Sequence, residues 1–174
     1  MTTTEAYEAK EALEMYTVAN EFCIFTENIS EYKSKSILLF YSRILPLLYV
    51  KGSLLKNIDY DENFPSERFV TEEIWENVFE TVKNKLSDDD IFYASYDFNT
   101  DLTETKSSIA ENIADIYQDL KDFTIQFSEG LVYQKNNAVS DCKTLFTNHW
   151  GNRICLLMPA LHDKIYTTSE NNYY

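Results

Sequence analysis

Residues 109–127 decide the fold: Ile109-Ala-Glu-Asn-Ile-Ala-Asp-Ile-Tyr-Gln-Asp-Leu-Lys-Asp-Phe-Thr-Ile-Gln-Phe127. Large apolar residues recur in this stretch at steps of four and three, namely at Ile109, Ile113, Ile116, Leu120, Phe123 and Phe127. This spacing lays one apolar seam along an α-helix, and such seams pack against antiparallel neighbours in a bundle. The pattern predicts a helix over residues 104–128 that is ended by Gly130 as its C-terminal cap.

Glycine and proline are scarce, with three of each in 174 residues. Hairpin turns and phosphate-binding loops favour glycine because they need positive φ angles or a close approach of the backbone. The scarcity therefore argues for an all-α fold. It also argues against Gly-rich nucleotide-binding loops and against the G-x-S-x-G turn of serine hydrolases.

Four further periodic apolar runs predict helices over residues 8–28, 34–56, 71–86 and 138–166. In the third of these, Ile74, Val78 and Val82 form the expected buried stripe. The stretch 57–70 is expected to be a polar connection, and 87–101 an irregular loop held to the core by its aromatic rings. We expect a single helical domain over residues 1–174, a mostly antiparallel bundle of about five helices. Its core spans roughly residues 8–166, with loosely ordered ends.

Acidic residues outnumber basic ones, 29 to 15, which gives a formal net charge of −14. Phosphate backbones and anionic membrane surfaces repel such a chain, so we expect neither nucleic acid nor a membrane as partner. A basic protein is the better candidate, although high net charge also serves solubility alone.

The three cysteines, Cys23, Cys142 and Cys155, are widely spaced in apolar helical runs. This usage predicts buried free thiols in a reducing compartment. The N-terminal residues lack the basic and apolar regions of a signal peptide. The apolar stretch 37–50 is too short to span a bilayer and contains Arg43. We therefore expect a cytoplasmic protein.

The most unusual polar residues are His149 and Arg153, one turn apart on an otherwise apolar helix face. An arginine on such a face must pair with a carboxylate or reach solvent. Glu111, Asp115 and Asp119 line one flank of the neighbouring predicted helix, so we expect a polar centre made of these five residues. It could fix the register of two helices or form a binding pocket.

A metal site is the competing hypothesis for the acidic residues. Glu72, Glu73 and Glu76 resemble the first half of the magnesium site of all-α nucleotide pyrophosphohydrolases, whose next helix supplies Glu-x-x-Asp. Here Glu111 and Asp115 are four residues apart and far downstream, so that second half is missing. We favour solvated carboxylates in a first helical turn and expect neither a metal nor a cofactor.

Several stretches together resemble a known family. They are Thr17-Val-Ala-Asn-Glu-Phe-Cys23, Ile44-Leu-Pro-Leu-Leu-Tyr49, residues 108–123, His149-Trp-Gly-Asn-Arg153 and Ala160-Leu-His162. The chain resembles, over residues 10–165, an uncharacterised bacterial family built on a domain of unknown function, DUF5063. The resemblance implies a compact helical domain and supplies no activity.

The sequence therefore favours a non-enzymatic acidic binding protein, for example an inhibitor or immunity-type protein that faces a basic partner. One alternative is a metal-dependent hydrolase of the pyrophosphohydrolase type, using Glu72, Glu73 and Glu76 with Glu111 and Asp115. The other is a small-molecule binder centred on His149 and Arg153. The oligomeric state and the identity of any ligand stay open.

Overall fold

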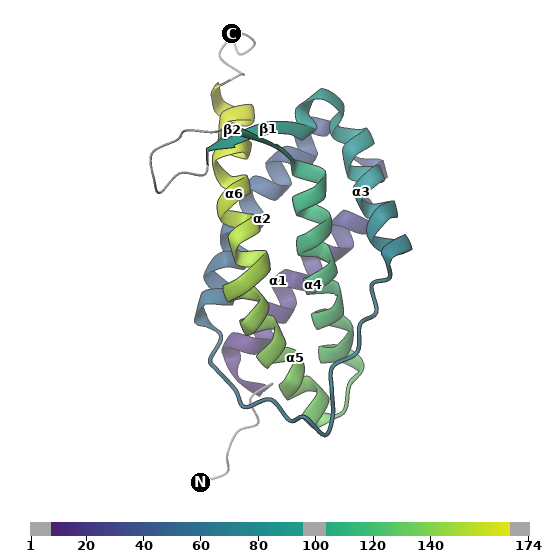
Figure 1. The fold of residues 1–174 in the computed structure, drawn as a ribbon, viewed down its shortest axis with the longest axis vertical. Coiled ribbons are helices and arrows are strands. Elements are labelled where there is room, and N and C mark those ends of the chain that lie inside the picture. Colours follow the sequence, from purple (N-terminus) through teal and green to yellow (C-terminus); the bar gives the residue numbers. More distant parts are fainter. Residues whose placement is uncertain (1–7, 96–103, 168–174) are drawn as a thin grey trace.

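A computed structural model describes residues 8–95 and 104–167, which form a helical bundle (Figure 1). Its helices are α1 (Lys10–Glu27), α2 (Ser34–Leu54), α3 (Glu72–Leu86), α4 (Ile109–Glu129), α5 (Val132–Leu145) and α6 (Gly151–His162). Two π-helical turns, Phe146–Trp150 and Asp163–Thr167, make residues 132–167 one continuous helical run. Counted that way, the described part of the chain has five long helices, and the all-α prediction is confirmed.

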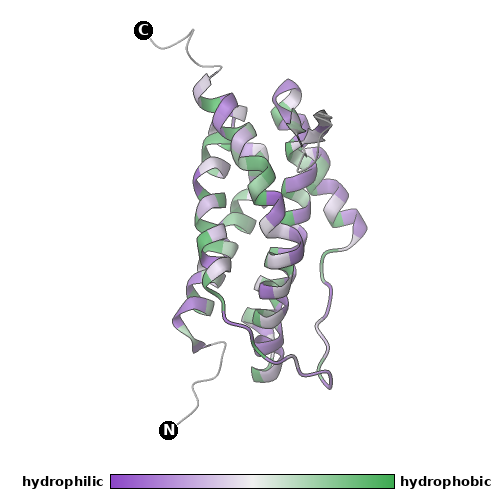
Figure 2. Cartoon of the chain, turned by 60° about the vertical axis from the view of Figure 1, so that its left-hand side comes forward, coloured by the Kyte–Doolittle hydropathy of each residue, from purple (hydrophilic) through white to green (hydrophobic). Residues whose placement is uncertain are grey.

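The core is organised around α4, which packs against α1, α3, α5 and α6. All six members of its apolar seam are buried, as the spacing predicted. Figure 2 shows hydrophobic and hydrophilic residues interspersed along the helices, as amphipathic packing requires. Gly130 does follow the helix, but with φ of −69° it is extended and does not form a left-handed cap.

The predicted start of α4 at residue 104 is wrong, because residues 104–108 form a strand. Strands β1 (Ile91–Ser95) and β2 (Glu104–Ser108) pair antiparallel, with Ile91 opposite Ser108. The hairpin is joined to α4 by the buried carboxylate of Asp90, which accepts hydrogen bonds from Ser108 Oγ at 2.8 Å and Ala110 N at 2.7 Å. Scarce glycine therefore did not exclude a short sheet.

The aromatic residues of this region behave differently from one another. Phe92 is buried and anchors β1 to the core, whereas Tyr93 is exposed. Tyr96 and Phe98, which the loop prediction also included, lie outside the described residues. Anchoring by rings is thus seen at one position of the strand.

Helix α3 begins where predicted, with Thr71 Oγ1 accepting a hydrogen bond from Ile74 N. Its buried residues are Val78, Val82 and Leu86, while Ile74 is 40% exposed, so the predicted stripe is wrong at its first position. Trp75 instead makes the contact with α4, through its indole nitrogen, and Ile74 is thereby turned to solvent.

Helix α2 and the π-helical turn before α6 meet closely at Gly52. A Cβ atom at this position would lie 2.4 Å from Cη2 of the fully buried Trp150. The π-helical turn creates a second tight place, because a Cβ atom on Gly151 would lie 2.3 Å from the carbonyl oxygen of Phe146. Both glycines therefore serve close packing.

The cysteine prediction holds for two of the three residues. Cys23 and Cys142 are buried free thiols, and burial raises the pKa of Cys23 to about 12. Cys155 is exposed, against expectation. The buried face of α6 is formed by Ile154, Leu157 and Leu161, which turns residue 155 outward.

A long connection, residues 55–71, crosses the lower end of the bundle from α2 to α3 (Figure 1). We call it the strap. Polar side chains of α5 bind its backbone: Asn137 exchanges hydrogen bonds with the main chain of Asp61 and also donates to the carbonyl of Phe64. Ser140 donates to the carbonyl of Ile58. Side chains thus satisfy strap groups that have no sheet partner.

Candidate functional site

A row of polar residues runs along α4 beside its apolar seam, and we call it the polar row. Its members are Asn112, Asp115, Asp119, Asp122 and Gln126. They follow one another at steps of three and four, so they share one helix face. All are buried except the partly buried Asp115, and the face they form is covered by α6, the strap and α3.

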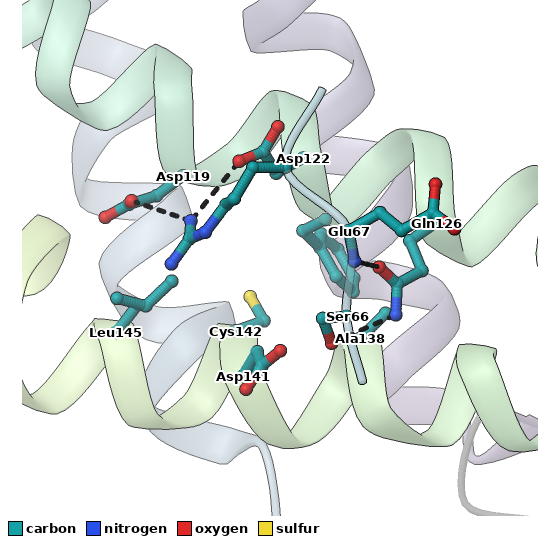
Figure 3. A pocket seen from close by; sticks show the side chains of 11 residues that line it. Ser66, Glu67, Asp119, Asp122, Gln126, Ala138, Asp141, Cys142 and Leu145 are labelled. Atoms are coloured by element: carbon teal, nitrogen blue, oxygen red, sulfur yellow. Dashed lines mark hydrogen bonds and ion pairs between the residues drawn. The ribbon is translucent and has the colours of Figure 1, made fainter. Parts of the chain in front are cut away.

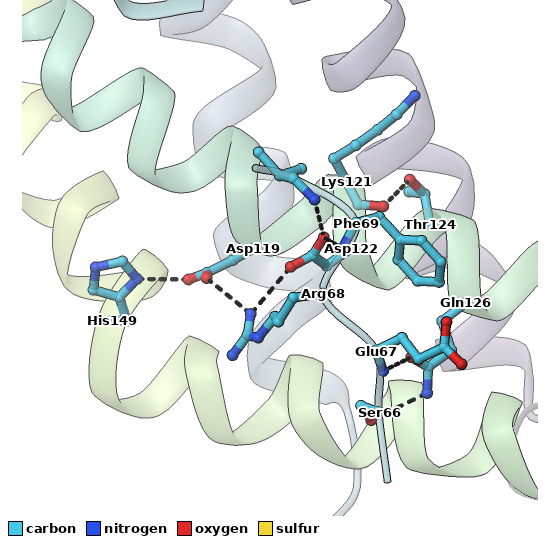
Figure 4. A network of polar contacts seen from close by, with 11 residues as sticks. Ser66, Glu67, Arg68, Phe69, Asp119, Lys121, Asp122, Thr124, Gln126 and His149 are labelled. Atoms are coloured by element: carbon cyan, nitrogen blue, oxygen red, sulfur yellow. Dashed lines mark hydrogen bonds and ion pairs between the residues drawn. The ribbon is translucent and has the colours of Figure 1, made fainter. Parts of the chain in front are cut away.

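The middle of the row contacts the π-helical turn before α6. His149 Nδ1 lies 2.6 Å from Asp119 Oδ2. Burial raises the pKa of Asp119 above its ordinary value, and the hydrogen bond with His149 acts in the opposite direction. In Figure 4 the second ring nitrogen of His149 points away from the network. The pair is therefore a carboxylate-oriented imidazole at the edge of the bundle.

The upper part of the row holds Arg153. Its guanidinium lies 2.8 Å from Asp115 Oδ2 and donates to Asn112 Oδ1 at 3.3 Å. The other oxygen of Asp115 accepts a hydrogen bond from Trp75 Nε1 at 3.0 Å. One carboxylate thereby connects α3, α4 and α6.

Four of the five residues of the predicted polar centre therefore meet, as two separate pairs. The fifth, Glu111, is exposed in the first turn of α4, where its backbone N–H is capped by Ser108 Oγ. No ion pair joins Glu111 to Arg153 in the described structure.

The lower part of the row binds the strap, and sequence reasoning missed these residues. Asp122 Oδ1 accepts hydrogen bonds from the backbone N–H groups of Phe69 and Val70, and its Oδ2 pairs with Arg68 at 3.2 Å. Arg68 also lies 3.9 Å from Asp119. Gln126 accepts from the backbone N–H of Glu67 (Figure 4). The spacing of the polar row in steps of three and four is visible in the sequence, but this periodicity does not predict where the strap lies.

A small cavity lies where the strap, α4 and α5 meet (Figure 3). Arg68, Asp119, Gln126 and Cys142 are among its walls, and its volume is about 20 Å³, room for about one water molecule. Sites for small organic ligands usually enclose about 300–1,000 Å³. The polar row thus consists of satisfied contacts around a space too small for such a ligand.

A larger hollow of about 280 Å³ lies between the start of α1, the first strap residues and α5. The buried side chains in its wall are apolar: Ala12, Leu55 and Val139. Its polar walls are the partly buried Glu11 and the exposed Lys56 and Asn57, so no fully buried polar group fixes the orientation of a ligand there.

The three glutamates of the metal hypothesis, Glu72, Glu73 and Glu76, are all exposed at the start of α3. Within residues 8–95 and 104–167, no three His, Cys, Asp or Glu side chains are grouped closely enough to hold a metal ion. The structure does not bring these glutamates together with Glu111 and Asp115.

The outer side of α2 exposes several large apolar residues. Leu47, Val50 and Leu54 are 42%, 51% and 51% exposed, and we call these three residues the α2 stripe. The opposite side of the helix, which includes Tyr41, Leu45 and Leu48, is buried. The helix is 21 residues long and, by length and composition, could cross a membrane. The helix extends beyond the apolar stretch 37–50, so its length alone does not exclude a span, and helices in the core of water-soluble proteins reach the same length and composition. In this structure α2 packs against α1 and α6.

Comparisons with known proteins identify the family. The model of a domain of unknown function, DUF5063, matches residues 6–167. A crystal structure of protein BF1032 from Bacteroides fragilis, a structural genomics target, is 34% identical, with a TM-score of 0.84 over 93% of this chain and 96% of that chain. No curated protein matches this sequence. The chain therefore belongs to the DUF5063 family, a family with no assigned function.

Proposed function

We propose that this domain is a non-enzymatic protein-interaction module that docks its partner on the outer side of α2. The observation that carries the proposal is the exposed α2 stripe. Its residues fall at positions i, i+3 and i+7, the spacing at which a helix presents apolar anchors to a partner's groove. Surface leucine and valine in one row are a recognised feature of interaction sites, whereas isolated ones are ordinary.

The state of the polar row supports a binding role over catalysis. Its carboxylates and Gln126 are already hydrogen-bonded to Arg153, His149, Arg68 and the strap backbone. Cys142, whose thiol lines the same small cavity as Asp119, is buried, and burial raises its pKa, so it does not supply a thiolate nucleophile. The contacts tie helices and strap together.

Photo-crosslinking in living cells tests this proposal. A photoreactive amino acid is placed at Val50 and, as a matched control, at Glu76, an exposed helical position on α3. We expect a discrete adduct from position 50 that weakens when Leu54→Ser is added. The absence of an adduct at position 50, or the same adducts from both positions, would contradict docking at α2.

A further inference from the structure

The two longest segments of the chain without an acidic residue stand out, because the chain has 29 acidic residues. They are residues 32–58 and 142–162. The seven basic residues within them are Lys33, Lys35, Arg43, Lys51, Lys56, Lys143 and Arg153. All acidic residues lie elsewhere, with only eight of the 15 Lys and Arg residues. The sequence is thus divided sharply by charge.

The fold places these two segments side by side. They contain α2 and α6, which pack against each other along the bundle (Figure 1). Tyr49 and Phe146 stack edge to face across the contact, with ring centroids 5.1 Å apart. Lys143 Nζ reaches the carbonyl of Ser53 at 3.2 Å. The two segments therefore lie side by side, and together we call them the acid-free side, since their own residues include no Asp or Glu. Carboxylates of α1 and α4 reach three of these residues, Lys51, His149 and Arg153.

The α2 stripe lies on this acid-free side, and Arg43 continues it. Arg43 is exposed and precedes Leu47 by one helical turn, so residues 43, 47, 50 and 54 follow one another along the outside of α2. Lys56 is exposed just beyond the helix end. Lys51 is different, since Glu14 of α1 holds its ammonium group at 2.8 Å. A partner that covers the stripe removes water from Arg43, and a guanidinium without water needs an anion.

We infer that the partner segment is an acidic amphipathic helix, whose apolar side covers the α2 stripe and whose carboxylates face Arg43 and Lys56. This inference rests on the proposed docking at α2. The net charge of the whole chain favours a basic partner, but at contact distance the local charge decides, since charges beyond about 8–10 Å are screened at physiological salt. The exposed charged side chains nearest the α2 stripe in the chain, Arg43 and Lys56, are both positive.

Two other occupants fit the observations less well. A second copy that docked by its own α2 would offer Arg43 no carboxylate from that helix, because α2 contains no acidic residue. An anionic bilayer would attract the acid-free side. A bilayer is a wide plane, however, so it would also face the rest of a molecule whose net charge is −14 and would repel it. A protein segment covers the acid-free side alone.

Selection from a phage library tests the inference without requiring the natural partner. The library displays amphipathic helical peptides with a fixed apolar stripe and randomised flanking positions. It is selected on the full-length protein and, in parallel, on a Val50→Ser, Leu54→Ser double variant. We expect Asp and Glu to be enriched at the flanks on the unaltered protein, with no enrichment on the double variant.

The winning peptide is then titrated against Arg43→Glu and against Lys83→Glu, a matched charge reversal on exposed α3. We expect Arg43→Glu to weaken binding on the order of tenfold, and Lys83→Glu to leave it within about twofold. Circular dichroism melts verify that the variants fold.

The outcomes separate the two claims. If the selected peptides bind through the α2 stripe but lack acidic flanks, or if Arg43→Glu does not weaken their binding, the inference of an acidic partner is overturned. Docking at α2 is then still supported. No stripe-dependent peptide overturns both. Binding only to phosphatidylserine-containing vesicles overturns the acidic-helix inference in favour of a membrane. A dimer that Val50→Ser dissociates overturns it in favour of a second copy.

Discussion

Nδ1 of His149 lies 2.6 Å from Oδ2 of Asp119, and this contact joins the π-helical turn before α6 to the middle of α4. Arg153, four residues after His149, meets Asp115, four residues before Asp119. Two pairs at matched spacing on antiparallel helices fix one register, because a shift by one residue would separate both. The polar row therefore fixes the register between α4 and the helical run that contains α6.

The Asp119 carboxyl predicts a specific dependence of stability on pH. Burial raises its folded-state pKa above the ordinary 3.8, so the folded protein holds this proton more tightly than the unfolded chain does. The resulting stabilisation is complete below 3.8 and is lost as pH rises through the folded-state value. We expect the unfolding free energy of the unaltered protein, relative to Asp119→Asn, to increase from about pH 7 to about pH 4.

Urea unfolding of both proteins across that range measures this difference. Glu111→Gln, at an exposed position of the same helix, is the control and should show no such trend. A difference that shrinks on acidification would mean that the ion pair with His149 outweighs burial.

The Asp115–Arg153 pair predicts coupling between two substitutions. The Arg153 side chain is 34% exposed, so Arg153→Met is expected to cost about 1–2 kcal/mol, less than the loss of a fully buried partner. In a double-mutant cycle with Asp115→Asn, the combined cost should fall short of the sum by about 0.5 kcal/mol or more. Thermal and urea unfolding supply the four values. Strict additivity would show that the pair does not act as a unit.

Asp122 predicts how the strap is held. In Asp122→Ala the backbone N–H groups of Phe69 and Val70 lose their acceptor, and Arg68 loses its nearer carboxylate. We expect both amides to exchange hydrogen much faster while the α4 amides keep their protection. Glu129→Ala, at the exposed end of α4, is the control. Unchanged protection of Phe69 and Val70 would show that other contacts hold the strap.

Gly52 predicts a packing cost. The Cβ atom of Gly52→Ala would meet Trp150, which is fully buried and has no room to move aside. Although alanine favours helices, we expect a net destabilisation of about 1–3 kcal/mol from overpacking. The neighbouring exposed position, Ser53→Ala, should be nearly neutral. A higher melting temperature for Gly52→Ala would contradict the tight contact between α2 and the π-helical turn before α6.

Local periodicity explains what the sequence predicts correctly. The apolar seam of α4 and the start of α3 each depend on residues that lie within a few helical turns of one another, so the sequence predicts both. Strand β2 was not, because its pairing depends on residues 91–95 and not on its own pattern. Cys155 was misplaced because an apolar neighbourhood in sequence does not say which way one position of a helix points.

For the candidate site too, the sequence predicts the residues that stand out in a local pattern and misses those whose contacts are distant in sequence. His149, Arg153, Asp115 and Asp119 were found because each breaks or flanks an apolar pattern on its own helix. Arg68 lies in a connection without periodicity, and its contact with Asp122 bridges 54 positions of sequence. The sequence did not predict the α2 stripe, because exposed and buried leucines cannot be told apart until the packing of the bundle shows which side of α2 faces solvent.

The most direct test of docking at α2 is the hydrogen-exchange footprint of the partner that crosslinks at position 50. Amide exchange of the full-length protein is compared with and without this partner. We expect new protection in α2 around residues 43–54, with the amides on the exposed side of α3 unchanged. Protection confined to α3 or to the polar row, with none on α2, would contradict docking at α2.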